Sequence, residues 1–172
     1  MEPAAVAVQA IKEGEVLFGD TVAIFGAAPI GLLTTMAAKA VGATCAINSS
    51  ESNAINKYTD NGVDVAFEIA GVAPTFNSAI DVTKARGTVV IVSIFGHPIE
   101  WNPMQLTNTG VKLTSTIAYT PTTFQQTINL INEGNLKVKD VITDEIELNN
   151  IVKSGFEQLV HDKSQAKILV KI

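Results

Sequence analysis

Hydrophobic and polar positions along the 172-residue chain form two kinds of segment. Short runs of consecutive aliphatic and β-branched residues, bounded by glycine or polar turns, are typical of strands buried on both faces. Longer segments with apolar residues three and four positions apart are typical of helices packed on one side. The strand-like runs are 21–25, 45–47, 63–69, 88–94 and 111–119. The helix-like segments are 2–12, 29–41, 50–57 and 74–84.

The alternation of these segments predicts an α/β protein built on a doubly wound parallel sheet of the Rossmann type. Neighbouring parallel strands need a crossover connection, which is usually a helix. Such crossovers are right-handed, so few topologies remain to be considered. The pattern extends over residues 1–118, which we predict to form one sheet domain.

The last part of the chain follows a different pattern. Thr120 and Pro121 suit the N-cap and first position of a helix, and Gly134 suits its end. The apolar face predicted for this helix consists of Phe124, Ile128 and Ile131. A second helix is expected over 150–161 and a strand over 167–172. We therefore predict a C-terminal helical and strand tail over residues 119–172.

Composition and charge exclude several classes of protein. Twelve basic and seventeen acidic residues give a net charge of −5, which disfavours binding to nucleic-acid phosphates. No apolar run reaches the roughly 18 residues that a membrane span needs. An acidic residue at position 2 stands where a secretory signal would be basic, so a cytoplasmic location is expected. The single cysteine excludes an internal disulfide and a zinc site made of several cysteines.

A glycine-containing turn joins the strand-like run 21–25 to the helix-like segment 29–41. In the sequence GAAPIG, Gly26 permits a tight turn and Gly31 permits close packing of the helix on the strand. The N–H groups of Ile30 and Gly31 would meet a pyrophosphate, because Pro29 has none. Ala28 replaces the middle glycine of the dinucleotide fingerprint, and its methyl group would stand where the phosphates approach. The segment suits both a nucleotide site and an ordinary strand-to-helix turn.

The residue that would bind the ribose is also ambiguous. In dinucleotide-binding folds an acidic residue near the end of the second strand binds the ribose hydroxyls. Glu51 follows Gly31 at about the expected spacing of 20 residues. Glu51 also follows two serines that suit a helix start, where the helix dipole favours a carboxylate. Both roles stay open from the sequence.

Eight segments together resemble the coenzyme-binding half of zinc-dependent medium-chain alcohol and polyol dehydrogenases. They are EPAAVAV at 2–8, GDTV at 19–22, GAAPIGLL at 26–33, NGVDVAFE at 61–68, GTVV at 87–90, AYT at 118–120, GFEQL at 155–159 and KILVKI at 167–172. The resemblance covers nearly the whole chain. It implies an enzyme that uses zinc and transfers hydride between a secondary alcohol or diol and NAD, with NADP as an alternative.

Two features of the family have no full counterpart here. The N-terminal catalytic domain that carries the zinc ligands is missing. We therefore expect this chain to be the cofactor-binding portion of such an enzyme and to be inactive alone. Its C-terminal tail would pack on the catalytic domain. Family members also have two strands and a helix where this chain has only residues 42–61. The strand 45–47 would then be either the second strand, with Glu51 near the ribose, or the third strand, with the acidic residue deleted.

The resemblance assigns further site residues. Ala70, Gly71 and Val72 resemble the turn beside the nicotinamide-side ribose. The residues Ser93, Ile94 and Phe95 resemble a strand end that holds the carboxamide through backbone groups. Glu2 would lie next to the zinc of an intact enzyme; from the residues alone it is a helix-start carboxylate.

The run 111–118 would lie at the edge of the sheet, with no lysine after Lys112 to protect it. This exposed edge, and the similar family habit of dimerising through this domain, predict a homodimer. Coverage of the edge by the tail helices is the alternative. Two other functions stay open, a Rossmann scaffold that has lost dinucleotide binding and a dimerisation module. Ala28 and the short segment 42–61 favour the scaffold.

Overall fold

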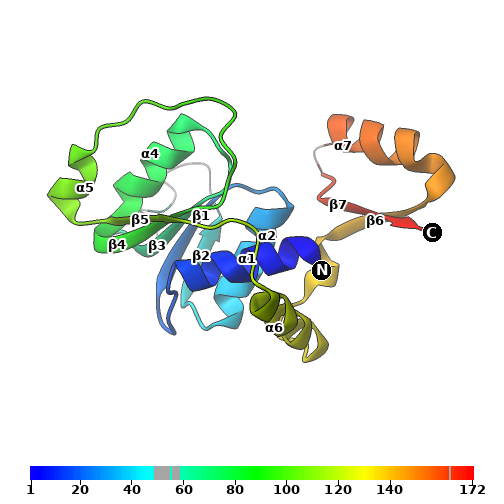
Figure 1. Cartoon of the computed structure of the whole chain (residues 1–172), viewed down its shortest axis with the longest axis horizontal. Helices are drawn as coiled ribbons and strands as arrows, with labels where there is room; N and C mark the ends of the chain where they lie inside the picture. The colour runs from blue at the N-terminus through cyan, green and yellow to red at the C-terminus, as the bar shows by residue number, and fades with distance from the viewer. Residues whose placement is uncertain (49–54, 56–58, 163) are drawn as a thin grey trace. The chain divides into compact units, whose positions relative to one another are not determined.

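The computed structural model describes residues 1–48, 55, 59–162 and 164–172, with backbone alone over 45–48 (Figure 1). The chain divides into two compact units, Met1–Leu136 and Lys137–Ile172. The boundary lies later than position 118, where the sequence pattern changes. Each unit is described by itself below.

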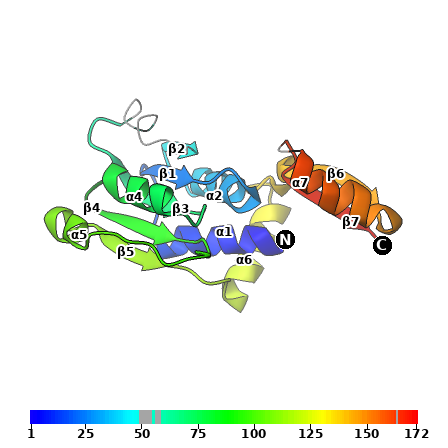
Figure 2. The ribbon, with the colours of Figure 1, turned by 90° about the horizontal axis from the view of Figure 1, so that it is seen from above.

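A five-stranded parallel sheet forms the centre of the first unit. Its strands are β1 (Thr21–Phe25), β2 (Cys45–Asn48), β3 (Val63–Glu68), β4 (Thr83–Ile91) and β5 (Lys112–Ser115). They lie in the order β2-β1-β3-β4-β5, and every pairing is parallel. The neighbouring strands β4 and β5 can be followed in Figure 2. The predicted Rossmann-type α/β class is confirmed.

Helices cover both faces of this sheet. They are α1 (Glu2–Glu13), α2 (Pro29–Ala40), α4 (Ala73–Val82), α5 (Met104–Thr109) and α6 (Pro121–Asn132). The connections from β1 to β2 and from β3 to β4 run in opposite directions along the sheet, so right-handed crossovers place α2 and α4 on opposite faces. Figure 1 shows α4 above the strands and α1 and α2 below them. Within the described residues, no helix has the length and hydropathy needed to cross a bilayer.

The core lies between the sheet and these helices. Small side chains line the buried face of α1, where Ala5, Ala7 and Ala10 are fully buried and allow α2 to approach closely. On the other face, Phe76 of α4 makes edge-to-face contacts with Phe95 and Trp101, with ring centroids 6.2 and 5.5 Å apart. Such aromatic pairs stabilise the core beyond their buried area.

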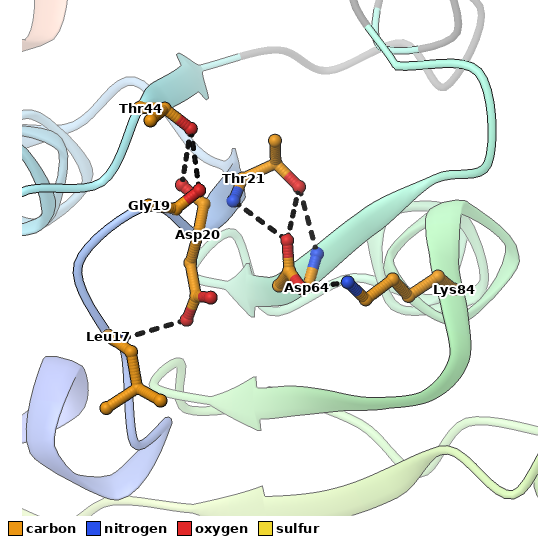
Figure 3. A network of polar contacts seen from close by, with 7 residues as sticks. All are labelled: Leu17, Gly19, Asp20, Thr21, Thr44, Asp64 and Lys84. Atoms are coloured by element: carbon orange, nitrogen blue, oxygen red, sulfur yellow. Dashed lines mark hydrogen bonds and ion pairs between the residues drawn. The ribbon is translucent and has the colours of Figure 1, made fainter.

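Strand β4 begins earlier than the pattern predicts. The predicted helix 74–84 ends at Val82, and the strand expected over 88–94 starts at Thr83. The reason is a polar network at the amino ends of the strands, shown in Figure 3, in which Lys84 forms an ion pair with Asp64 of β3. This contact holds residues 83 and 84 beside β3, where Thr83 pairs with Val63.

The same network fixes the start of β1. The Asp64 carboxylate accepts the Thr21 N–H at 2.9 Å and the Thr21 hydroxyl at 2.7 Å. Burial raises the pKa of the Asp64 carboxyl, but Lys84 and these two Thr21 donors outweigh burial and bring the pKa below its usual value. The network therefore ties β1, β3 and β4 together at the edge opposite the glycine-containing turn.

Two other predicted elements differ from the structure. The strand expected over 111–119 is limited to Lys112–Ser115, and Ala118 further on has a φ of 48°, which a strand cannot adopt. The helix expected over 50–57 falls outside the described residues except for Ile55, which is fully buried.

Helix α6 starts as predicted but buries a different face. The Thr120 hydroxyl accepts the Thr123 N–H at 3.1 Å, as the N-cap assignment requires. The predicted apolar face is only half-buried, whereas Thr123 and Thr127 are fully buried. Lys12 of α1 explains this, because its ammonium donates to the Thr123 hydroxyl at 3.2 Å and draws the polar face of α6 towards α1.

The second unit is a pair of parallel strands with a helical connection. Its elements are η1 (Val138–Val141), β6 (Ile142–Glu147), η2 (Leu148–Asn150), η3 (Ile151–Glu157), α7 (Gln158–His161) and β7 (Lys167–Lys171). The helix predicted over 150–161 is a π-helical segment, η3, followed by the single turn α7. Buried Gly155 lets η3 approach Ile146 of β6, since a Cβ there would lie 3.3 Å from the Ile146 Cδ1. The strand predicted at 167–172 is confirmed, whereas β6 was not predicted, because its sequence ITDEIE is strongly acidic.

Candidate functional site

Three turns meet at the carboxyl edge of the first unit's sheet, because its strands are parallel. They follow β1, β3 and β4. A Cβ atom added to Gly26 would lie 3.2 Å from the Ile69 Cβ, and one added to Gly71 would lie 2.8 Å from the Ile94 carbonyl oxygen. The turns therefore pack backbone against backbone, at the edge where open α/β sheets bind ligands.

The turn after β1 has the geometry of an anion-binding helix start. Gly26 has a φ of 142°, a conformation that glycine tolerates and other residues rarely adopt. Ala28 is the N-cap of α2 and supplies no side-chain hydrogen bond. Pro29 occupies the first helical position, and the N–H of Leu32 is the first to bond back, to the Ala28 carbonyl at 3.1 Å. Helix geometry thus leaves the N–H groups of Ile30 and Gly31 directed at the end of the helix.

Ala28 causes no strain in the protein itself. Its φ of −69° and ψ of 171° lie in the extended region open to any residue, and the residue is exposed. The Ala28 methyl group is therefore expected to weaken the binding of a ligand and not to destabilise the fold.

The turn after β3 is organised by Glu68, which the sequence analysis did not identify. Glu68 is the last residue of β3 and is fully buried. One carboxylate oxygen, Oε1, accepts the N–H groups of Ala70 and Gly71 at 3.0 and 2.9 Å and the Thr75 hydroxyl at 2.7 Å. The other, Oε2, bonds the Ser93 hydroxyl of the turn after β4. A carboxylate that ends an apolar strand just before a turn glycine was the signal available in the sequence.

The remaining residues of these two turns give the edge an apolar surface. Val72, the N-cap of α4, is exposed, and the Ile94 side chain is 95% exposed. Phe95 instead packs inward on Phe76. The structure thus brings together the residues predicted around positions 26–31, 70–72 and 93–95.

Two predicted site residues are not brought into this group. Glu51 lies outside the described residues. Glu2 is an exposed residue in the first turn of α1. In the described part of the chain, no three histidine, cysteine, aspartate or glutamate side chains are grouped so that they could hold a metal ion.

The position of β2 in the sheet can be compared with the two alternatives given above, in which residues 45–47 form either the second or the third strand of the family's sheet. Cys45 and Thr21 are register partners, so β2 lies directly beside β1. In a doubly wound sheet of this order, that position belongs to the second strand, whose carboxyl end faces the ribose. Residues 45–48 thus occupy the place of the second strand, and within the described residues no strand pairs with the other side of β2.

Comparisons with known proteins agree with this fold. The zinc-binding dehydrogenase family matches residues 23–133. An (R,R)-butanediol dehydrogenase of Bacillus subtilis is 33% identical over 195 residues, covering 99% of this chain and 56% of that protein. Sorbitol dehydrogenase 1 of Saccharomyces cerevisiae is 26% identical, again over 99% of this chain and 56% of the relative.

Solved structures give the same result. The crystal structure of 2R,3R-butanediol dehydrogenase from Bacillus subtilis superposes with a TM-score of 0.90 at 32% identity, covering 99% of this chain and 56% of that one. A zinc-binding dehydrogenase from Sinorhizobium meliloti, solved with NADP, has the same fold with a TM-score of 0.84 at 24% identity, covering 99% and 58%.

The chain spans about half the length of the curated relatives it matches. The alignment with the Bacillus subtilis enzyme extends over 195 residues although this chain has 172, so the chain lacks residues within the matched region. The family match covers well over half of the chain, and the fold agrees with it. The chain therefore belongs to the zinc-binding dehydrogenases and corresponds to the coenzyme-binding half of their zinc-dependent medium-chain members.

Proposed function

We propose that this chain binds NAD at the carboxyl edge of its sheet, as part of an oxidoreductase that transfers hydride between NAD and a secondary alcohol or diol of the butanediol or sorbitol kind. The observation that carries the proposal is the start of α2. The N–H groups of Ile30 and Gly31 lie at this helix start, the N-cap residue Ala28 provides no side-chain hydrogen bond to them, and Ala28 is exposed. A helix start of this kind stabilises a pyrophosphate through N–H groups and the helix dipole.

The residues present fit the dinucleotide at three turns. Gly26, Ala28, Pro29, Ile30 and Gly31 would hold the pyrophosphate. Ala70–Val72 would line the ribose next to the nicotinamide, and Ser93–Phe95 would lie beside the carboxamide. NADP stays an alternative cofactor, and Glu51 stays the proposed ribose ligand that would favour NAD.

Zinc, when bound in an intact family enzyme, supplies a Lewis acid that polarises the alcohol oxygen. Glu2 is the one residue of this chain proposed to lie beside it. The alcohol pocket belongs, in this proposal, to the part of the relatives that the chain does not match. We therefore expect the 172-residue chain to bind cofactor without turning over an alcohol.

A homodimer through the edge of β5 forms part of the proposal. Strand β5 is the last strand of the described sheet on that side, and Ile117 just beyond it is 92% exposed. A strand at the end of a sheet, with an exposed apolar side chain near it, favours pairing with a second copy of the same chain.

The second candidate function is a Rossmann scaffold without cofactor binding. Ala28 supports it, and so does the lack of residues within the region matched to the Bacillus subtilis enzyme. Isothermal titration calorimetry of the chain and its A28G variant with NADH separates the candidates. Saturable binding, tighter in A28G, supports the cofactor-binding function; no binding by either protein supports the scaffold.

A further inference from the structure

Two helices of the first unit, α2 and α4, begin at the carboxyl edge of the sheet. They differ in whether a carboxylate lies beside the first turn. The N-cap of α2 is Ala28, and no carboxylate bonds to its first turn in the described structure. The start of α4 has Glu68 beside it, and the Glu68 Oε1 lies 2.7 Å from the hydroxyl of Thr75 in the first turn. A carboxylate at this position satisfies the positive end of the α4 dipole.

The hydrogen bonds of Glu68 also decide what the turn after β3 can offer a ligand. The N–H groups of Ala70 and Gly71 both point to Oε1, at 3.0 and 2.9 Å. A buried carboxylate that accepts several donors holds them firmly, because each bond is charge-assisted. At these two residues the turn can therefore present carbonyl oxygens to a ligand but not N–H groups.

Glu68 further joins this turn to the next one. Its Oε2 bonds the Ser93 hydroxyl, and its backbone carbonyl accepts the N–H groups of Val92 and Ser93 at 2.9 and 3.3 Å. The close approach of Gly71 to the Ile94 carbonyl depends on this alignment. One fully buried side chain thus sets the polarity and the position of two of the three turns.

We infer that Glu68 is a positioning residue that makes the β3–β4 part of the edge acceptor-rich and closed to anions. That part would take the uncharged, hydroxyl-bearing half of the ligand, whose groups can donate hydrogen bonds, while the α2 start takes the phosphates. The inference rests on the proposed function. It adds that Glu68, without contacting the dinucleotide, determines which half of the dinucleotide lies at α2 and which half lies at the turns after β3 and β4.

The test compares ADP with ADP-ribose, in which the terminal phosphate of ADP is esterified to a second ribose. ADP carries the phosphates expected at α2, and ADP-ribose adds a second ribose that would reach the turn after β3. Dissociation constants for both are measured with the wild-type chain, with E68Q and with S93A. E68Q keeps the shape of the side chain and removes its charge, whereas S93A keeps the carboxylate and removes one of its partners.

The expected result is a change in the ratio of the two constants. In E68Q the ADP-ribose dissociation constant rises about tenfold, while that of ADP stays within about twofold. S93A shows a smaller shift in the same direction. Hydrogen exchange of the Ala70 and Gly71 amides should also become faster in E68Q.

Three outcomes overturn the inference and are distinct from one another. An equal change for both ligands shows that Glu68 acts on the fold as a whole. No change for either ligand, with a lower melting temperature, shows a stabilising role only. Failure of the wild-type chain to bind either ligand overturns the proposed function, and with it the inference that rests on it.

Discussion

Gly26 and Ile69 lie so close that a Cβ atom on the glycine would stand 3.2 Å from the Cβ of the isoleucine. This contact joins the turn that would bind the phosphates to the turn that Glu68 organises. A change at Gly26 is therefore expected to affect the protein even without ligand.

The substitution G26A should lower the free energy of unfolding by roughly 2 kcal/mol. Alanine at a φ of 142° is strained, and its methyl group would press on the turn after β3. Urea unfolding followed by circular dichroism measures the change. We expect NADH binding to weaken in the same variant.

Two other glycines serve as controls for G26A. A Cβ atom added to Gly96 would meet no described atom within 4 Å, and Gly96 has no positive φ, so G96A should change stability by less than about 0.5 kcal/mol. Gly19 has a φ of 94°, and a Cβ atom added there would meet no described atom within 4 Å, so G19A measures backbone strain without the contact. An effect of G26A no larger than that of G19A would show that the contact with Ile69 does not matter.

The N-cap of α6 gives a second test, independent of ligand. In T120A the Thr123 N–H loses its partner, and unfolding should become easier by about 1 kcal/mol. T122A is the matched control, because Thr122 is an exposed threonine and the second residue of the same helix. Thermal unfolding of both variants measures the difference; equal melting temperatures would contradict the assignment of the cap.

The Asp64–Lys84 network predicts a pH dependence of stability. The pKa of Asp64 is lower in the folded chain than in the unfolded one. Its ionised form therefore stabilises the fold above the unfolded pKa, and this stabilisation is lost as pH falls through the folded pKa. D64N should lower stability by about 1 kcal/mol at neutral pH and by progressively less in acid.

Urea unfolding at pH 7 and near pH 3 measures the effect of D64N. Asp60, an exposed residue of the turn before β3, provides the control variant D60N, which should change little at either pH. A D64N effect of the same size at both pH values would show that shape, and not charge, is what Asp64 contributes.

The proposed dimer is tested at the edge of β5. Sedimentation velocity of the wild-type chain should show a dimer, and S115K should shift it towards monomer, because a lysine on an edge strand opposes pairing. T122K adds the same charge on the exposed side of α6 and should leave the dimer intact. A monomeric wild-type chain would contradict the proposal.

The sheet could be predicted from the sequence because its strands are continuous apolar runs ended by glycine. The runs around Val22–Phe25 and Val63–Glu68 became central strands, and the turn at Gly26 followed at the expected place. What the pattern could not give are features that depend on distant residues. The early start of β4 depends on Asp64 and Lys84, and the buried face of α6 depends on Lys12.

The candidate site was predicted in part for the same reason. The turns at 26–31, 70–72 and 93–95 follow strands, and parallel strands bring their carboxyl ends together. Glu68 was missed because a carboxylate in a strand suggests exposure, whereas its partner Ser93 comes from the turn after β4, which only the fold brings to it.

The most direct test of the account is the response of individual backbone amides to NADH. In a ¹⁵N-labelled chain, the amide signals of Ile30 and Gly31 should show the largest shifts on titration, because their N–H groups would bond the pyrophosphate. The Ala70 and Gly71 amides should shift little, since Glu68 holds them. Saturating shifts centred on α2 would support the account; no shifts at Ile30 and Gly31 at saturating NADH would contradict it.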